Sequence, residues 1–291
     1  MKNFKGVYAA LLTPFTEDNQ INYSSLEKLI NYNIDNGLTG MYVCGSTGES
    51  MLMSEEERID ILRFTKKIAK DRCTLIAHIG NISTDSAIRM AKVAEDCGYD
   101  AISAVAPFYY SFSKEAIKGY YIDIINSSKL PLIIYNFPCG NGFNGMLELV
   151  GDLIDNEKLI GVKHTSQNLF ELEMFKHLKK PLTVFNGFDE MLIAGLSMGA
   201  DGGIGSTYNF LAPMILDIYN NFNKGDIKAA QAVQTKVNRI IEAIIPFGVF
   251  AMEKQILTYL GIPMGNCRKP FLPVSAEGDK LAKEIANSLK K

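Results

Sequence analysis

The sequence has little of what metal sites, disulfide frameworks and membrane spans require. Its three histidines, His78, His164 and His177, occur in no zinc-type spacing, and its five cysteines include no Cys-x-x-Cys pair. These patterns predict no bound metal and reduced thiols. The longest apolar runs, such as residues 131–135, fall far short of the ~18 residues that a membrane span needs. With no recognisable cleavable targeting segment, we expect a cytoplasmic protein that does not contact membranes.

The charge balance also excludes some partners. Thirty basic residues stand against 32 acidic residues, and no block of like charge exceeds the short run at residues 55–57. A nucleic-acid-binding or anionic-lipid-binding protein usually carries a basic patch, which is lacking here. With 47% apolar and 21% charged residues, the chain is an ordinary globular protein, and we expect a small-molecule substrate.

What is present is a regular alternation of short β-branched runs and helical stretches, which is typical of βα units and a parallel sheet. The predicted strands are 6–12, 40–44, 74–79, 101–106, 132–135, 159–163, 182–185 and 202–204. After residue 204 only helical stretches follow, near 212–222, 227–245, 249–259 and 276–289. We therefore predict an α/β fold, a (β/α)8 TIM barrel over residues 1–223 with a C-terminal helical extension over residues 224–291 packed on it.

Local signals support this architecture. Ser54 and Glu57 form a capping-box pattern before apolar residues at helical spacing, which predicts a helix over about 54–70. Gly37, Gly98 and Gly199 each stand just before a predicted strand, where a left-handed residue ends the preceding helix. A doubly wound open sheet is the alternative, but the glycine-rich segment 202–205 lies at the eighth strand and lacks the third glycine of a dinucleotide fingerprint.

In a barrel the catalytic residues lie at the carboxyl ends of the strands, and there Lys163 stands out. An ammonium at the end of a buried strand is either paired with a carboxylate or desolvated. Desolvation favours the neutral amine, which attacks carbonyl carbons. The alternative is a structural role, in which Lys163 forms an ion pair with Glu49 or Asp189 across the barrel mouth.

Two further groups are expected beside this lysine. Tyr135 ends the preceding strand, so its phenol could carry protons for a Schiff base. The alternative, which is commoner for a lone tyrosine, is a ring packed in the core with its hydroxyl in solvent. Ser46 and Thr47 lie between glycines and offer hydroxyls and amides suited to a carboxylate, although many turns share this pattern.

Six motifs carry a resemblance that covers the chain from Gly6 to Pro273. They are Gly45-Ser46-Thr47-Gly48-Glu49, Tyr135-Asn136-Phe137-Pro138, Gly161-Val162-Lys163-His164-Thr165-Ser166, Asn186-Gly187-Phe188-Asp189-Glu190, residues 199–206 and Cys267-Arg268-Lys269-Pro270-Phe271. Their content and order closely resemble the pyruvate-dependent class I aldolases of the dihydrodipicolinate synthase and N-acetylneuraminate lyase family.

This resemblance implies a cofactor-free barrel in which Lys163 forms the Schiff base and Tyr135 is the proton shuttle. Residues matching Ser46 and Thr47 hold the substrate carboxylate in the family. Those that bind the sugar portion match Thr165, Gly187, Asp189, Glu190 and Ser206. The family is usually tetrameric, and a residue matching Tyr109 can reach a neighbouring subunit's site.

The lyase branch of the family is the better match. The synthase branch usually has Thr-Thr in place of Ser46-Thr47, and an arginine where this chain has residues 139–142. The implied activity is reversible aldol cleavage of N-acetylneuraminate to N-acetylmannosamine and pyruvate, in sialic acid catabolism. A family enzyme acting on a different aldehyde and a non-catalytic barrel that binds pyruvate or sialate are the rival hypotheses.

Two points in this reading stay open. Asp189 could merely cap the following helix, with Glu190 favourable in its first turn. His164 and His78 are assigned no role, and His78 is interpreted as a satisfied histidine at a strand end.

Overall fold

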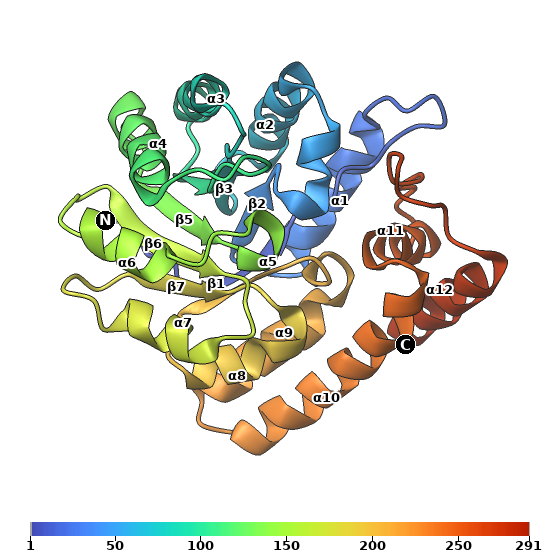
Figure 1. Cartoon of the computed structure of the whole chain (residues 1–291). Helices are drawn as coiled ribbons and strands as arrows, with labels where there is room; N and C mark the ends of the chain where they lie inside the picture. Colours follow the sequence, from blue (N-terminus) through green and yellow to red (C-terminus); the bar gives the residue numbers. More distant parts are fainter. Residues whose placement is uncertain (1, 291) are drawn as a thin grey trace.

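The computed structural model describes residues 2–290, except for the side chains of Cys139 and Asn141. Eight parallel strands close into a barrel in chain order, so the predicted fold is confirmed (Figure 1). The strands are β1 (Gly6–Ala10), β2 (Gly40–Val43), β3 (Thr74–His78), β4 (Ala101–Val105), β5 (Leu132–Asn136), β6 (Leu159–His164), β7 (Thr183–Asn186) and β8 (Gly202–Gly205).

Helices surround the strands and continue beyond the barrel. Those that follow β1 to β8 are α1 (Tyr23–Asp35), α2 (Glu55–Ala69), α3 (Thr84–Cys97), α4 (Lys114–Ser127), α5 (Pro138–Asn141), α6 (Met146–Leu153), α7 (Leu169–Lys176), α8 (Leu192–Ser197) and α9 (Tyr208–Asn223). Three more complete the chain: α10 (Ile227–Ile244), α11 (Val249–Tyr259) and α12 (Ala276–Leu289). Short 3-10 helices are η1 (Ser46–Gly48), η2 (Ser50–Leu52), η3 (Asp189–Met191) and η4 (Ile245–Phe247).

The local signals in the sequence have the predicted structural effect. At α2 the Ser54 side chain accepts from the Glu57 amide while the Glu57 carboxylate accepts from the Ser54 amide, which is a complete capping box. Gly37, Gly98 and Gly199 have φ values of 83°, 78° and 93°, in the left-handed region that glycine enters without a Cβ penalty. These joints direct the chain from each helix into the next strand.

The helical extension shares the barrel's hydrophobic core. Figure 1 shows α10, α11 and α12, coloured orange to red, together on one side of the barrel. Val237 and Met252 from the extension are fully buried in the same apolar cluster as Val7 and Leu62 of the barrel. Helix α9 ends at Asn223 and α10 begins at Ile227, but one hydrophobic core runs across both helices. A domain boundary at residue 223 therefore stays a prediction.

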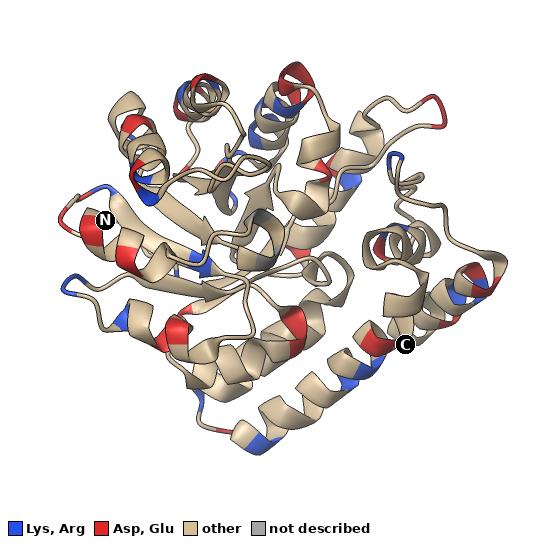
Figure 2. Ribbon diagram, in the orientation of Figure 1, with Lys and Arg blue, Asp and Glu red and all other residues tan. Residues whose placement is uncertain are grey.

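The outer surface is of mixed charge. Figure 2 shows basic and acidic residues interspersed along the outer helices. Within residues 2–290, no helix is both long enough and apolar enough to cross a membrane. Over the same residues, no three His, Cys, Asp or Glu side chains gather into a candidate metal site. Cys44, Cys73, Cys97 and Cys267 are free thiols.

Candidate active site

A cavity of about 290 Å³ is lined by residues from the carboxyl ends of the barrel strands and by residues of the helical extension. All nine proposed catalytic and substrate-binding residues line it: Ser46, Thr47, Tyr135, Lys163, Thr165, Gly187, Asp189, Glu190 and Ser206. A larger hollow of about 770 Å³ lies beside residues 263–269, but the Arg268 guanidinium in its wall is already paired with Glu57. The chemistry therefore points to the smaller cavity.

Lys163 lies near the end of β6 and is 5% exposed. Its Nζ lies 4.2 Å from the ring centroid of Tyr135 and 4.6 Å from that of Tyr42. Such cation–π contacts hold an amine in place without neutralising it as a carboxylate would. Over the part of the chain that the structure describes, Lys163 forms no ion pair, so the alternative of a pair with Glu49 or Asp189 is wrong.

Tyr135 is held on several sides by rings. The pairing of β5 with β6 places it directly beside Lys163 in the sheet register. Phe137 stacks on its ring at a centroid distance of 5.6 Å and an interplanar angle of 6°, and Tyr42 meets it edge-on at 6.2 Å. The Tyr135 hydroxyl makes no hydrogen bond to any described residue, so this packing fixes the ring while leaving its hydroxyl available to a substrate.

The segment Ser46–Gly48 forms η1, immediately after β2. Thr13 Oγ1 donates to the Gly48 carbonyl at 2.8 Å. The next residue, Glu49, has a left-handed φ of 59° and a fully buried carboxylate. That carboxylate accepts from Lys254 Nζ and, at 2.7 Å, from the Arg268 amide. The serine–threonine segment is therefore anchored from the helical extension.

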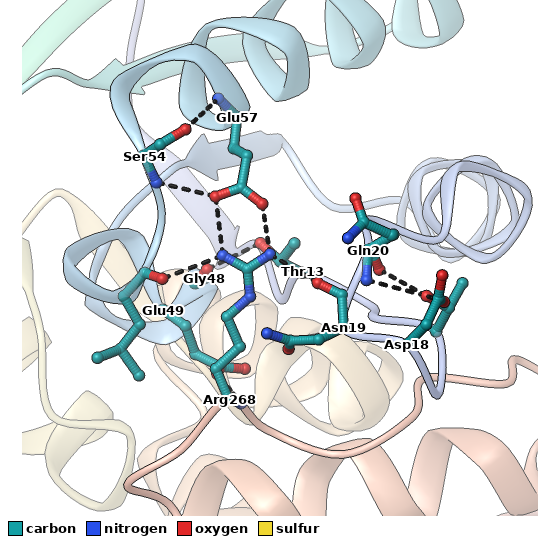
Figure 3. A network of polar contacts seen from close by, with 11 residues as sticks. Thr13, Asp18, Asn19, Gln20, Gly48, Glu49, Ser54, Glu57 and Arg268 are labelled. Carbon is teal, nitrogen blue, oxygen red and sulfur yellow. Dashed lines mark hydrogen bonds and ion pairs between the residues drawn. The ribbon is translucent and has the colours of Figure 1, made fainter.

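Arg268 reinforces the same anchor, as Figure 3 shows. Its guanidinium pairs with the Glu57 carboxylate and donates to the Leu52 carbonyl at 3.0 Å and the Asn19 carbonyl at 2.9 Å. A planar guanidinium suits this role because it donates in several fixed directions at once. One side chain thus joins the loops that follow β1 and β2 to the C-terminal segment.

Thr165, directly after β6, and Gly187, directly after β7, lie very close to each other. A Cβ added to Gly187 would lie 1.8 Å from Thr165 Oγ1, so only glycine allows this approach. The buried Thr165 Oγ1 has no hydrogen-bond partner in the structure. A buried hydroxyl without a partner is costly, and a bound polar ligand would supply one.

Asp189 joins the loops that follow β7 and β8. Its Oδ2 accepts from the Thr207 amide at 2.8 Å and from the Thr207 hydroxyl at 2.6 Å. Burial raises the pKa of Asp189 to about 6, although these two hydrogen bonds act in the opposite direction. The alternative that Asp189 merely caps the next helix is wrong, because no side chain caps η3 or α8.

Glu190 lies at the edge of the cavity and Tyr109 lies outside it. Glu190 lines the cavity, but its side chain is exposed, so burial does not force it to find a partner. Tyr109 does not line the cavity; it is 85% exposed, has a φ of 79°, and stacks edge-on with Tyr110. The single chain therefore leaves this aromatic pair in solvent.

The histidines near the site are structural. His78 is fully buried; its Nδ1 hydrogen-bonds with the Cys44 carbonyl and its Nε2 accepts from the Val105 amide. Burial lowers the pKa of His78 to about 3, so the ring is neutral at pH 7. His164 hydrogen-bonds with Asn136 and with the Asn168 carbonyl.

Several cavity residues were not identified from the sequence. The apolar side chains of Ile241, Ile245, Val249 and Phe250 form a wall contributed entirely by the helical extension. Behind Ser206 lies the buried carboxylate of Glu253, also from the extension. No local motif marks these positions, because they reach the cavity only through the packing of α10 and α11 on the barrel.

Comparisons with known proteins show what the chain as a whole is similar to. A protein named N-acetylneuraminate lyase from Rhizobium meliloti is 42% identical over 93% of this chain and 90% of its own length. One of the same name from Salmonella typhimurium is 40% identical over 99% and 98%. The crystal structure of CdNal from Clostridium difficile in complex with mannosamine superimposes with a TM-score of 0.96 at 38% identity, covering 99% of this chain and 100% of that one. Residues 3–289 match the Dihydrodipicolinate synthetase family, and the chain therefore belongs to that family.

Proposed function

We propose that this protein cleaves N-acetylneuraminate reversibly to N-acetylmannosamine and pyruvate, as a class I aldolase. Relatives named for this lyase activity are 40–42% identical over nearly the whole chain. The observation that carries the mechanism is the unpaired amine of Lys163 beside the Tyr135 ring, in a cavity rich in hydroxyl groups. We likewise propose the roles of the individual residues.

The neutral amine of Lys163 attacks the C2 ketone of open-chain sialate, and the carbinolamine loses water to form a protonated imine. Tyr135 carries the protons of this step, and its hydroxyl has no competing partner among the described residues. Having given its phenol proton to the departing water, Tyr135 accepts the proton of the C4 hydroxyl as a phenolate, and the C3–C4 bond breaks. The electron pair of that bond forms the C2=C3 double bond while the C2=N π pair moves to nitrogen, which leaves a pyruvate enamine and releases the aldehyde.

Protonation of the enamine at C3 and hydrolysis of the resulting imine release pyruvate and restore the Lys163 amine. Water lost when the imine forms is returned when it is hydrolysed, so the cycle balances without an external oxidant or reductant. The hydroxyls of Ser46 and Thr47 bind the substrate carboxylate. No arginine is among the described residues that line the cavity, so these hydroxyls take the place of a guanidinium.

The opposite wall binds the hydroxylated chain. Thr165 Oγ1 is a buried hydroxyl that needs a partner, and Asp189 Oδ2 is occupied by Thr207 while Oδ1 makes no hydrogen bond among the described residues. Gly187, Glu190 and Ser206 line the same wall. A polyhydroxylated substrate supplies the donors and acceptors that this wall lacks.

The test is reductive trapping followed by peptide mapping. Borohydride reduction with pyruvate should add one pyruvyl group to the peptide that holds Lys163, and the protein should release pyruvate from N-acetylneuraminate. Labelling of another lysine would refute the assignment of Lys163. Trapping at Lys163 combined with condensation on aspartate semialdehyde, and no cleavage of sialate, would place the chain with the synthase branch instead.

We also infer a homotetramer in which the loop after β4 meets a neighbouring subunit. Tyr109, Tyr110 and Phe112 are 85%, 63% and 37% exposed and contact one another. A contiguous apolar cluster of this kind is usually covered in an assembly. Light scattering at micromolar protein should give the tetramer mass, and replacing Tyr110 by serine should lower it. A monomeric mass for the unaltered protein would contradict the inference.

A further inference from the structure

A second carboxylate lies behind the sugar-binding wall, and the mechanism above does not use it. Glu253, in α11, is fully buried and does not line the cavity. Its Oε1 accepts a hydrogen bond from the Ser206 hydroxyl at 2.6 Å. Ser206 itself lines the cavity, so this bond joins a buried residue of the helical extension to the binding surface.

The contacts of Glu253 do not offset the cost in stability of burying a carboxylate. Its Oε2 has no hydrogen-bond partner among the described residues. The ammonium of the adjacent Lys254 pairs with Glu49, and the charge that acts on Glu253 is the repulsive one of the Asp189 carboxylate. A buried carboxyl without a cation normally costs stability, so a different reason for this residue is required.

Protonation reduces that cost. Burial, together with repulsion from Asp189, raises the pKa of Glu253 well above its usual range, while the Ser206 hydrogen bond acts the other way. The uncharged acid still offers a carbonyl oxygen to the Ser206 hydroxyl. In this respect it resembles a glutamine side chain of the same length.

We propose that Glu253 is a positioning residue that fixes the Ser206 hydroxyl at the cavity wall and so strengthens binding of the hydroxylated part of the substrate. A free serine hydroxyl rotates among several orientations, and ordering it on binding costs entropy. With its proton committed to Glu253, Ser206 Oγ is held ready to accept from a substrate hydroxyl. The inference rests on the proposed lyase function and assigns a substrate-recognition role to the helical extension.

The experiment compares Glu253→Leu and Glu253→Gln with the unaltered protein. Glu253→Leu removes the acceptor while keeping an apolar side chain of similar size. It should raise KM for N-acetylneuraminate by ~3–10-fold, the scale of one lost neutral hydrogen bond. The kcat and the extent of pyruvate trapping at Lys163 should change by less than about twofold. Glu253→Gln keeps an acceptor oxygen and should restore most of the lost affinity.

A double-mutant cycle with Ser206→Ala shows whether Glu253 acts through Ser206. On the Ser206→Ala background, Glu253→Leu should cause no further rise in KM, because the group it positions is gone. Gln255→Leu is the matched control: it lies on the same helix and bonds Asp279, away from the cavity, and should leave KM unchanged.

Three results would overturn the inference: an unchanged KM in Glu253→Leu, equal damage to pyruvate trapping and sialate binding, or effects of the two substitutions that simply add. Each of these results counts only if the unaltered protein cleaves sialate. Failure of the unaltered protein to cleave sialate would overturn the proposed function itself and the inference that rests on it.

Discussion

Removing the Lys254 ammonium is the sharpest test of how the segment Ser46–Gly48, proposed to bind the carboxylate, is held. The side chains of Lys254 and Glu49 are 1% and 0% exposed, and Nζ also lies 4.4 Å from the Phe15 ring centroid. Lys254→Met keeps the length of the side chain but leaves the buried Glu49 charge without its ammonium partner, although the Arg268 amide still donates to it. Breaking a buried pair in this way costs about 3–5 kcal/mol of unfolding free energy.

For a chain of this length, that loss corresponds to a fall in Tm of roughly 6–10 °C, taking about 2 °C per kcal/mol. Urea denaturation at fixed protein concentration measures the free energy directly. Because Glu49 directly follows the Ser46–Gly48 segment, the pyruvate concentration needed for half-maximal trapping should rise as well. A loss of stability below about 1 kcal/mol would refute the argument that this pair anchors the loop.

Two controls separate the buried charge from a general effect of the substitution. In the double variant Glu49→Gln with Lys254→Met, neither charge of this pair remains, so stability should recover part of the loss seen in Lys254→Met alone. Arg239→Met breaks an exposed pair with Glu242, whose side chains are 70% and 67% exposed, and should cost less than about 1 kcal/mol. A double variant no more stable than Lys254→Met would show that lost packing, not the unpaired charge, causes the damage.

Three further predictions concern catalysis. Tyr135→Phe should retain the fold and pyruvate binding but lower turnover of sialate at least ~10²-fold in a pyruvate-release assay, and near-normal turnover would assign the proton transfer to another group. Glu190→Ala should lower kcat/KM for sialate by the equivalent of ~1–3 kcal/mol in transition-state binding, nearer the lower end because the Glu190 side chain is exposed. Pyruvate trapping should be nearly unchanged, and an equal loss in both assays would make Glu190 a structural residue. Since the pKa of Asp189 is raised to about 6, its acceptor form is populated above that pH, so kcat/KM for sialate should rise through pH 6; a profile unchanged in Asp189→Asn would exclude this residue as the cause.

The barrel and the adjacency of Tyr135 and Lys163 were predictable because their signals are local. Alternation of strand and helix patterns gave all eight strands within two residues at each end. Adjacent strands of a parallel barrel follow chain order, so the ends of β5 and β6 had to meet, and the register pairs Tyr135 with Lys163 as expected. The capping box at Ser54 and the glycine joints likewise depend only on neighbours in sequence.

The partners of the charged residues were not predictable in the same way. From the sequence, Lys163 was the cation considered for Glu49, because both lie at the barrel mouth. The structure gives Glu49 a cation 205 residues away in the chain, and Lys163 is left without a carboxylate. Periodicity locates α11 in the sequence but says nothing of where its polar side chains meet the barrel, since tertiary packing decides this.

Two consecutive residues of α11 connect the helical extension to both sides of β1. Lys254 pairs with Glu49 after β2, and Glu253 bonds Ser206 after β8; β2 and β8 are the two strands that flank β1. Successive residues on a helix point about 100° apart, so one turn of α11 reaches both loops at once. The proposed carboxylate-binding wall and the proposed sugar-binding wall are therefore set at a distance fixed by a single rigid helix. A small displacement of α11 would move both walls relative to Lys163, whereas the proposed Schiff-base lysine itself, carried on β6, would stay in place.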